Sequence, residues 1–264
     1  MSADRLSDDR LSDDRLAALA AAEAGRLLLD IRAGGLSGQE LGKEGDRRSN
    51  ELILSRLAAA RPHDAVLSEE SADSPARLSA SRVWIVDPLD GTREYGMADR
   101  PDWAVHVALW RRGTGIAAAA VAQPALGVVH ATDDPDDDVP GAPDRSARGE
   151  RPGPTILVSD SRPPEFAAAV ARAVGGRLQP MGSAGAKAMA VRRGEADAYL
   201  HAGGQWEWDS AAPVGVLEAA GFHTSRLDGS PLEYNRPHPY LPDLLLCRRD
   251  LAHDLLEAVQ PYLA

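Results

Sequence analysis

The 264-residue sequence has few of the residues on which several protein classes depend. A single cysteine, Cys247, excludes an internal disulfide framework and a cysteine-rich zinc site. No apolar run approaches the roughly 18 residues that a membrane-spanning helix needs. The acidic N-terminus also lacks the apolar segment of a secretory signal. We therefore expect a cytoplasmic protein with no membrane partner.

Positive charge is scarce as well. The chain has 29 lysine and arginine residues against 40 aspartate and glutamate residues, which gives a formal net charge of −11 at pH 7. A protein that binds DNA or RNA needs a basic surface that displaces counterions from the phosphates. We therefore expect no nucleic-acid polymer as a partner, although this composition allows a local basic pocket.

The first residues form a short repeat, because DRLSD at 4–8 recurs at 9–13. A period of five residues matches neither a helix nor a strand, so we expect residues 1–14 to form a mobile arm or a ragged extension of the helix that follows. Apolar residues then recur at three- and four-residue gaps over 16–31, which predicts a helix that Gly34 ends. A second helix is predicted over 46–60, with Pro62 beyond its end.

Short β-prone runs follow, and they predict strands over 66–68, 83–86, 103–110, 116–122 and 128–131. The stretch 132–154 is rich in Asp, Pro, Gly and Arg and is predicted to be a flexible loop at a domain boundary. We expect an N-terminal α+β domain over 15–150 and a C-terminal α/β domain over 151–264.

The second half alternates between strands and helices. Strands are predicted over 156–158, 198–200 and 244–246, and helices over 164–174, 184–193, 209–220 and 252–262. Helices that cover sheets in both halves favour a layered α/β or α+β architecture.

The most informative segment is DPLDGT at residues 87–92. A short apolar strand ends in Asp87, Pro88 is expected to force a turn, and Asp90 is suited to the start of a helix. Two carboxylates across such a turn, together with the carbonyl of Leu89, can point to one place and offer the hard oxygen ligands that Mg²⁺ prefers. The alternative is a polar turn in which Asp90 only caps a helix.

Further acids are placed where they can join this pair. Glu69 and Glu70 also follow a strand, and Asp209 lies at a predicted helix start, where capping is its alternative role. Two like charges about 4 Å apart repel by about 4 kcal/mol at an effective dielectric constant near 20. Converging carboxylates would therefore become protonated or separate unless cations lay between them. Two divalent ions neutralise such a cluster and are suited to the hydrolysis of a phosphate ester.

A phosphate also needs hydrogen-bond donors. The backbone amides of Gly91 and Thr92 would open a helix, and a helix N-terminus favours anions. Ser183 and Lys187 offer a hydroxyl and an ammonium at another predicted helix start. The alternative for this second segment is a helix entry with a solvated lysine.

These motifs resemble those of the inositol-monophosphatase superfamily of Mg²⁺-dependent, lithium-sensitive phosphatases. The resemblance rests on DPLDGT at 87–92, on WDSAA at 208–212 and on the upstream acids at 69–70, and it covers residues 15–264. LSEE at 67–70, TREY at 92–95 and the Gly-Ser pair at 182–183 with its downstream lysine are most similar to the CysQ-type 3′(2′),5′-bisphosphate nucleotidases within that superfamily.

The resemblance implies a layered αβαβα fold whose N-terminal domain binds the metal and whose C-terminal domain completes the active site. It implies two or three Mg²⁺ ions and inhibition by Li⁺. The metal ligands that it implies are Glu69, Asp87, the carbonyl of Leu89, Asp90 and Asp209. The spacing in the family favours Glu69 over Glu70 as the ligand. The catalytic residues that it implies are Thr92, Glu69 and Asp46.

One position departs from the family pattern. A Thr-x-x-Asp segment precedes the second helix in the family, and the corresponding stretch here reads KEGD over 43–46. Asp46 is kept but the threonine is replaced by Lys43, so the third metal position departs from the family pattern. Substrate contacts are expected from Glu69, Leu89, Asp90, Gly91, Thr92, Arg93, Ser183, Lys187 and Asp209.

The implied activity is Mg²⁺-dependent hydrolysis of the 3′-phosphate of 3′-phosphoadenosine 5′-phosphate, and of its phosphosulfate, to AMP in sulfur assimilation. Arg93 and Lys187 are candidates for the second phosphate, with exposed solvated charge as the alternative. Two other activities use the same metal site, those of an inositol monophosphatase and of a fructose-1,6-bisphosphatase. A more distant alternative is a non-catalytic nucleotide-binding regulator. The expected partner is a small phosphorylated substrate, and a second copy of the chain in a homodimer is a further expectation.

Overall fold

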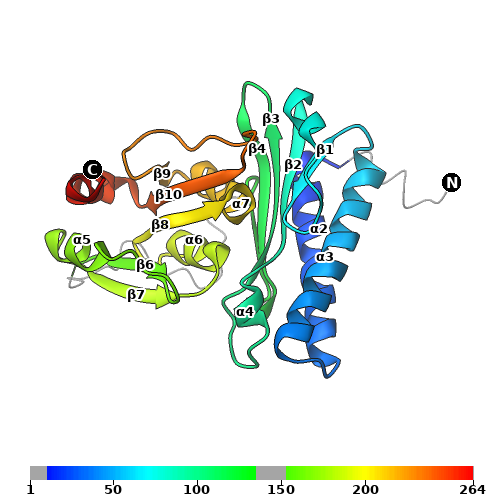
Figure 1. Cartoon of the computed structure of the whole chain (residues 1–264), viewed down its shortest axis with the longest axis horizontal. Helices are drawn as coiled ribbons and strands as arrows, with labels where there is room; N and C mark the ends of the chain where they lie inside the picture. Colours follow the sequence, from blue (N-terminus) through cyan, green and yellow to red (C-terminus); the bar gives the residue numbers. More distant parts are fainter. Residues whose placement is uncertain (1–10, 135–152, 264) are drawn as a thin grey trace.

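The computed structural model describes residues 11–134 and 153–263, which are arranged in five layers (Figure 1). Two helical layers cover the outer faces of two five-stranded sheets, and a third helical layer lies between the sheets. This is the expected αβαβα sandwich. Residues 1–10 of the expected arm and residues 135–152 of the predicted loop lie outside the described residues.

The outer helical layer next to the first sheet consists of α2 (Asp13–Ala33) and α3 (Gly38–Ala60). The buried face of α2 carries many alanines, which lets the helix lie close to α3 and to the sheet. Helix α2 begins inside the segment that we expected to be a mobile arm or a helix extension, and residues 13 and 14 agree with the second of these. Its first residue, Asp13, forms ion pairs with Arg61 and Arg82, both at 3.0 Å.

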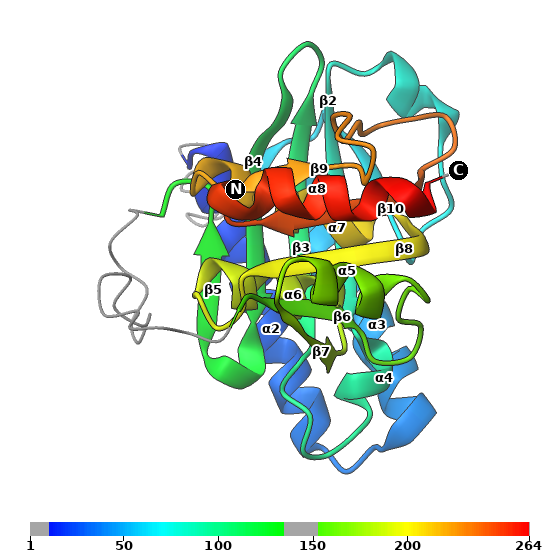
Figure 2. The same ribbon diagram turned by 90° about the vertical axis from the view of Figure 1, so that its left-hand side faces the viewer.

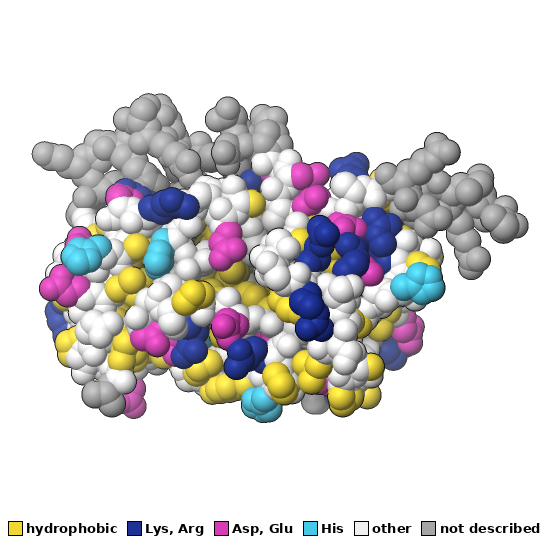
Figure 3. Space-filling view, turned by 90° about the horizontal axis from the view of Figure 1, so that it is seen from above, with side chains coloured by type: hydrophobic (Ala, Val, Ile, Leu, Met, Phe, Trp, Pro, Cys, Tyr) yellow, Lys and Arg dark blue, Asp and Glu magenta, His cyan; other side chains and the backbone are white. Residues whose placement is uncertain are grey.

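These pairs belong to a larger group of charges. Figure 3, a view from above, shows lysine and arginine side chains gathered on the half of the molecule that holds α2 and α3, with acidic side chains among them. Arg82 also pairs with Asp64 at 2.8 Å, and Arg56 pairs with Glu23 at 2.7 Å. The arginines named here are therefore bonded to carboxylates of the same chain.

The first sheet has the strand order β1-β2-β3-β4-β5, in which β1 and β2 are parallel and the other neighbours are antiparallel. Its strands are β1 (Ala65–Ser68), β2 (Arg82–Asp90), β3 (Ala104–Arg111), β4 (Gly115–Gln123) and β5 (Val128–Ala131). All five were predicted. Alternate residues of β2 enter different cores, because Trp84 and Val86 pack under α2 and α3 whereas Val83 and Ile85 face the middle layer.

The second sheet has the order β7-β6-β8-β10-β9. Its strands are β6 (Thr155–Ser159), β7 (Arg177–Met181), β8 (Ala198–Trp206), β9 (His223–Ser225) and β10 (Tyr240–Cys247). Sequence reasoning missed β7 and β9, which are the two edge strands. The sequence of β7 is RLQPM, largely exposed, and β9 has three residues, so neither shows the apolar alternation that identifies a strand.

The middle helical layer consists of α6 (Ala184–Arg192) and α7 (Glu207–Ala219), and the second outer layer of α5 (Ala167–Ala173) and α8 (Ala252–Val259). Figure 2 shows α5 and α8 in front of the second sheet. The central core joins residues of both sheets, such as Ile85 and Leu157, through α6 and α7. The two halves of the chain therefore share a core, and the division into domains at about residue 150 stays a proposal.

Helix α3 begins eight residues before the predicted start, so the stretch 43–46 lies inside the helix and does not precede it. Glycines obscure this first part in the sequence, since glycine weakens a helix. They allow close packing instead. A Cβ added to Gly42 would lie 2.7 Å from Cγ2 of Thr92, and one added to Gly45 would lie 2.9 Å from Cε1 of Tyr95.

Candidate active site

A β-bulge places two acids of the DPLDGT motif on the same side of β2. Asp87 pairs with His106 of β3 and Asp90 pairs with Ala104, so three steps along β2 match two steps along β3. In a regular strand, residues three apart face opposite sides of the sheet. The extra residue of the bulge brings both carboxylates to one side.

The expected turn at Pro88 is therefore wrong, because β2 continues to Asp90. Proline lacks the N–H that a regular strand pair uses and is accepted at a bulge. The carbonyl of Pro88 accepts a hydrogen bond from Oγ of Ser49 at 2.7 Å. The chain turns only at Gly91, whose φ of 83° suits glycine, and the helix that follows, α4 (Thr92–Tyr95), has a single turn.

Asp209 joins this pair from the middle helical layer. Asp87, Asp90 and Asp209 each offer a carboxylate oxygen, and these three oxygens lie within 4.8 Å of one another. Asp209 is the third residue of α7, and its Oδ2 accepts a hydrogen bond from the amide of Trp206 at 2.6 Å. The side chain thus caps the helix and contributes to the cluster, so its two predicted roles are compatible.

Glu69 completes the cluster from the end of β1. Because β1 and β2 are parallel, the residues that follow Ser68 come beside Asp87, and the amide of Glu69 donates to the carbonyl of Val86 at 3.2 Å. The side chain of Glu69 interacts with Asp87 and is repelled by Asp209. Glu70 repels both Glu69 and Asp46.

The cluster holds more negative charge than it can keep without counterions. Burial, followed by repulsion from Asp209, raises the pKa of Glu69 to about 8. Burial and repulsion from Asp90 raise the pKa of Asp209 to about 6. Burial and repulsion from Glu69 raise the pKa of Asp87 well above its ordinary value. A set of crowded oxygen donors with excess negative charge fits divalent cations such as Mg²⁺.

Asp90 differs from the other three acids because it is held by donors. Its carboxylate accepts hydrogen bonds from the amides of Ala184 at 3.1 Å and Gly185 at 2.7 Å, and also from Oγ of Ser183. Nε2 of His106 lies 3.3 Å away. Burial alone would raise the pKa of Asp90, but His106 and Ser183 outweigh it and lower the pKa to about 2. This carboxylate is therefore ionised and fixed in orientation.

The expected pair of Thr92 and Asp46 is present beside the cluster. Oγ1 of Thr92 lies 3.0 Å from the carbonyl oxygen of Leu89 and 3.4 Å from Oδ1 of Asp46. Burial and repulsion from Glu70 raise the pKa of Asp46 to about 7. A hydroxyl shared between a carbonyl and a carboxylate of this pKa is suited to proton transfer near neutral pH.

A cavity of about 520 Å³ opens onto these groups. The predicted site residues that line it are Glu69, Asp90, Gly91, Thr92, Arg93, Ser183, Lys187 and Asp209. Asp87 and Leu89 are buried and do not line the cavity. The structure therefore brings the predicted carboxylates and the predicted cations to one place.

Both predicted cations already have partners. Arg93 pairs with Glu94 at 2.6 Å and with Asp160 at 2.7 Å. Lys187 is 4% exposed, and its Nζ donates to the carbonyls of residues 181, 182 and 183 at 2.5–3.3 Å. Burial lowers the pKa of Lys187 to about 8. Contact of either side chain with a substrate phosphate stays a prediction, since the phosphate would compete with these partners.

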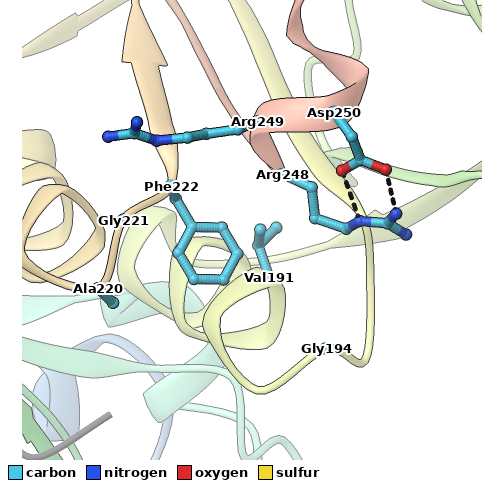
Figure 4. A pocket seen from close by; sticks show the side chains of 8 residues that line it. All are labelled: Val191, Gly194, Ala220, Gly221, Phe222, Arg248, Arg249 and Asp250. Carbon is cyan, nitrogen blue, oxygen red and sulfur yellow. Dashed lines mark hydrogen bonds and ion pairs between the residues drawn. The ribbon is translucent and has the colours of Figure 1, made fainter. Parts of the chain in front are cut away.

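A second cavity, of about 380 Å³, lies between Phe222, Val191 and the segment 248–250 (Figure 4). Its charged residues are Arg248, Arg249 and Asp250, and the first and last of these pair with each other. It contains none of the clustered carboxylates, so the chemistry described above belongs to the larger cavity.

A model of the inositol monophosphatase family matches residues 14–262 of this chain. The chain belongs to the inositol monophosphatase family. Members of this family depend on metal ions, in agreement with the cluster of Asp87, Asp90 and Asp209.

Relatives in this family carry more specific names. The 3′-phosphoadenosine 5′-phosphate phosphatase of Mycobacterium tuberculosis is 54% identical over 245 residues, which cover 90% of this chain and 89% of the relative. The 3′(2′),5′-bisphosphate nucleotidase CysQ of Escherichia coli is 32% identical over 209 residues, which cover 74% of this chain and 80% of the relative.

Solved structures of the family share the fold. The structure of CysQ from Bacteroides thetaiotaomicron superposes on this chain with a TM-score of 0.73 at 24% identity. The superposition covers 90% of this chain and 97% of that one. A staphylococcal IMPase-II gives a TM-score of 0.72 at 20% identity, with 92% of both chains covered. In the part of the chain that the structure describes, every helix is too short or too polar to span a bilayer.

Sequence reasoning missed several residues at the site of this family member. His106, which contacts Asp90, is a polar residue in the middle of an otherwise apolar predicted strand, and that contrast is a usable signal. Arg162, Gln205 and Tyr240 line the cavity but lie in segments without periodicity, so the sequence gives no signal for them.

Proposed function

We propose that this protein is a magnesium-dependent phosphatase that removes the 3′-phosphate of 3′-phosphoadenosine 5′-phosphate to give AMP. The observation that carries the proposal is the convergence of Asp87, Asp90 and Asp209 within 4.8 Å, beside Glu69 and the Thr92–Asp46 pair. The name of the 54% identical relative supports the nucleotide substrate, and the phosphosulfate form is a second expected substrate.

The residues proposed to hold two or three Mg²⁺ ions are Glu69, Asp87, the carbonyl of Leu89, Asp90 and Asp209. When bound, the ions would supply positive charge for the phosphate and lower the pKa of water. Asp90 is already ionised and held by the start of α6, which orients one ligand in advance.

The chain's own catalytic groups are proposed to be Thr92, Asp46 and Glu69. Oγ1 of Thr92 would accept a hydrogen bond from the attacking water and pass its own proton toward Oδ1 of Asp46. The bond between the water oxygen and phosphorus forms as the bond from phosphorus to the 3′-oxygen breaks, and the 3′-oxygen takes up a proton. The amides of Gly91 and Thr92 are proposed to hold the phosphate, with Ser183, Arg93 and Lys187 as the further substrate contacts.

An assay of phosphate release tests this function. The panel contains 3′-phosphoadenosine 5′-phosphate, inositol 1-phosphate and fructose 1,6-bisphosphate, each with and without Mg²⁺ and Li⁺. We expect the nucleotide to have the highest kcat/KM, Mg²⁺ to be required and Li⁺ to inhibit. A preference for inositol 1-phosphate or fructose 1,6-bisphosphate would instead favour the two alternative activities, and no release from any substrate would favour a regulator.

Other expectations stay predictions. These are a role in sulfur assimilation, a cytoplasmic location, a homodimer and the absence of nucleic-acid and membrane partners. Size-exclusion chromatography with light scattering measures the mass of the particle and tests the homodimer directly.

A further inference from the structure

One wall of the active-site cavity comes from the second sheet and has no role in the chemistry proposed above. We call Arg162, Gln205, Trp206 and Tyr240 the second-sheet wall; all four line the cavity. Strands β6 and β8 are parallel, so the segments that follow them emerge at the same edge of the sheet. Strand β10 is antiparallel to β8 and starts at this edge, where Tyr240 pairs with Trp206.

The wall presents two aromatic rings to solvent. Trp206 is 40% exposed and Tyr240 is 44% exposed. One face of the Trp206 indole is stacked on Trp208, with centroids 5.4 Å apart and planes 16° apart. Tyr240 meets Trp206 edge-on at 5.8 Å. His238 also meets Trp206 at an edge, with centroids 5.6 Å apart. The rings of Trp206 and Tyr240 that stay exposed beside these contacts offer aromatic surface to a flat ligand.

The local backbone makes room for these rings. Gly204 has a φ of 88°, and a Cβ at this position would lie 2.1 Å from Oη of Tyr240. The amide of Trp206 donates to Oδ2 of Asp209 at 2.6 Å. The turn that carries the indole is therefore tied to a proposed metal ligand, which fixes the rings relative to the reacting phosphate.

The wall also holds a cation and an amide nitrogen that have no partner in the described part of the chain. Among the described residues that line the cavity, Arg162 is the cation whose side chain has no ion pair or hydrogen bond. Gln205 is 8% exposed, and its Nε2 has no hydrogen-bond partner among the described residues. Because Gln205 lies in the cavity wall, a ligand bound there can supply a partner for this nitrogen.

We propose that the second-sheet wall binds the nucleoside 5′-phosphate part of the substrate. The base stacks against Trp206 and Tyr240, and Arg162 pairs with the phosphate that is not hydrolysed. Gln205 offers a hydrogen bond at the same wall. This subsite rests on the proposed function and specifies how the chain would distinguish a nucleotide from a sugar phosphate that has no base. The cavity volume of about 520 Å³ lies in the range of small-molecule sites.

Calorimetric binding of AMP tests the subsite without turnover, because this product carries only the base, the ribose and the second phosphate. Adenosine lacks the phosphate and ribose 5-phosphate lacks the base, so the three probes separate the two contacts. The variants are Arg162→Gln and Trp206→Ala. The control is Arg172→Gln, which changes an exposed arginine on α5 away from the cavity.

We expect Arg162→Gln to weaken AMP binding by roughly tenfold while its affinity for adenosine stays near that of the Arg172 control. We expect Trp206→Ala to weaken both AMP and adenosine by roughly tenfold and to affect ribose 5-phosphate much less. If Arg162→Gln and the control Arg172→Gln bind AMP with equal affinity, the phosphate contact of Arg162 is wrong. Equal losses for AMP and ribose 5-phosphate in Trp206→Ala would overturn the stacking contact.

Kinetics with 3′-phosphoadenosine 5′-phosphate separate this subsite from the proposed function. If the wild-type chain hydrolyses this substrate and both variants keep its KM, the subsite is wrong and the function stands. If the wild-type chain does not hydrolyse it but both variants lose affinity for AMP, the function is wrong and the subsite stands. Tyr240→Ala removes the second exposed ring and gives an independent result should the Trp206 variant fail to fold.

Discussion

Replacement of Asp87 by asparagine removes one charge from the carboxylate cluster with almost no change in shape. Asp87, Asp90 and Asp209 offer oxygens within 4.8 Å of one another, and two full charges at that distance repel by roughly 3.5 kcal/mol at a dielectric constant near 20. Asp87 takes part in two such pairs. Its raised pKa shows that the metal-free protein relieves part of this repulsion by binding a proton.

We therefore expect opposite effects on stability with and without magnesium. In EDTA at pH 8.5, Asp87→Asn should be more stable than the wild type by about 1–2 kcal/mol, because it no longer has to bind a proton or bear the repulsion. In a chain of this length that corresponds to a rise in Tm of roughly 2–6 °C. With magnesium at 100 times its Kd, the wild type should gain about 2.7 kcal/mol and the variant much less. The order of the two Tm values should thus reverse.

Thermal unfolding with and without magnesium measures this reversal, and phosphate release measures turnover. We expect kcat of Asp87→Asn to fall by at least about 10³-fold, equivalent to about 4 kcal/mol. Asp30→Asn, an exposed carboxylate on α2 outside the cluster, is the matched control and should change neither quantity. Near-wild-type activity of the Asp87 variant, or a loss of several kcal/mol of stability in EDTA, would refute the reasoning.

Three further predictions concern the neighbouring groups. Thr92→Ala should lower kcat by roughly 10²-fold and Thr92→Ser by much less, because serine keeps the hydroxyl; initial rates check this, and equal losses would count against it. Without metal, the raised pKa values of Asp46, about 7, and Glu69, about 8, mean that the folded protein binds more protons than the unfolded chain. Its urea midpoint in EDTA should therefore fall as the pH rises from about 4 to 8, and a midpoint that rises would contradict the assignment. Gly185→Ala would place a Cβ 2.1 Å from Nε2 of His106, so we expect the free energy of unfolding in urea to fall by about 1–3 kcal/mol. An unchanged free energy would show that the His106 side chain moves aside without cost.

The alternation of strands and helices predicted the layered fold, and the resemblance to the family predicted which acids meet. The structure brings Glu69 and Asp87 together because both acids follow apolar runs in neighbouring parallel strands. The geometry around Pro88 could not be predicted. Proline in a short motif indicates a turn, and the bulge that keeps it inside β2 depends on pairing with β3, which lies more than a dozen residues away.

The start of α3 and the position of Arg162 could not be predicted either, because both depend on tertiary contacts. Gly42 and Gly45 indicate a weak helix, yet α3 starts earlier because the helix must pack closely against Thr92 and Tyr95. Arg162 is one arginine among many in the sequence. Only the folded chain shows that Arg93 is already paired and that Arg162 has no such partner among residues 11–134 and 153–263.

The shared central core determines how far the chain could be divided. Helices α6 and α7 cover the inner faces of both sheets, so a fragment that ended at residue 134 would leave an apolar sheet face, including Val83 and Ile85, bare to water. That fragment would carry Glu69, Asp87 and Asp90 but not Asp209. If the gene were split into two separately translated fragments, each fragment would therefore aggregate and would lack part of the proposed set of metal ligands. Any activity would require the two fragments to associate.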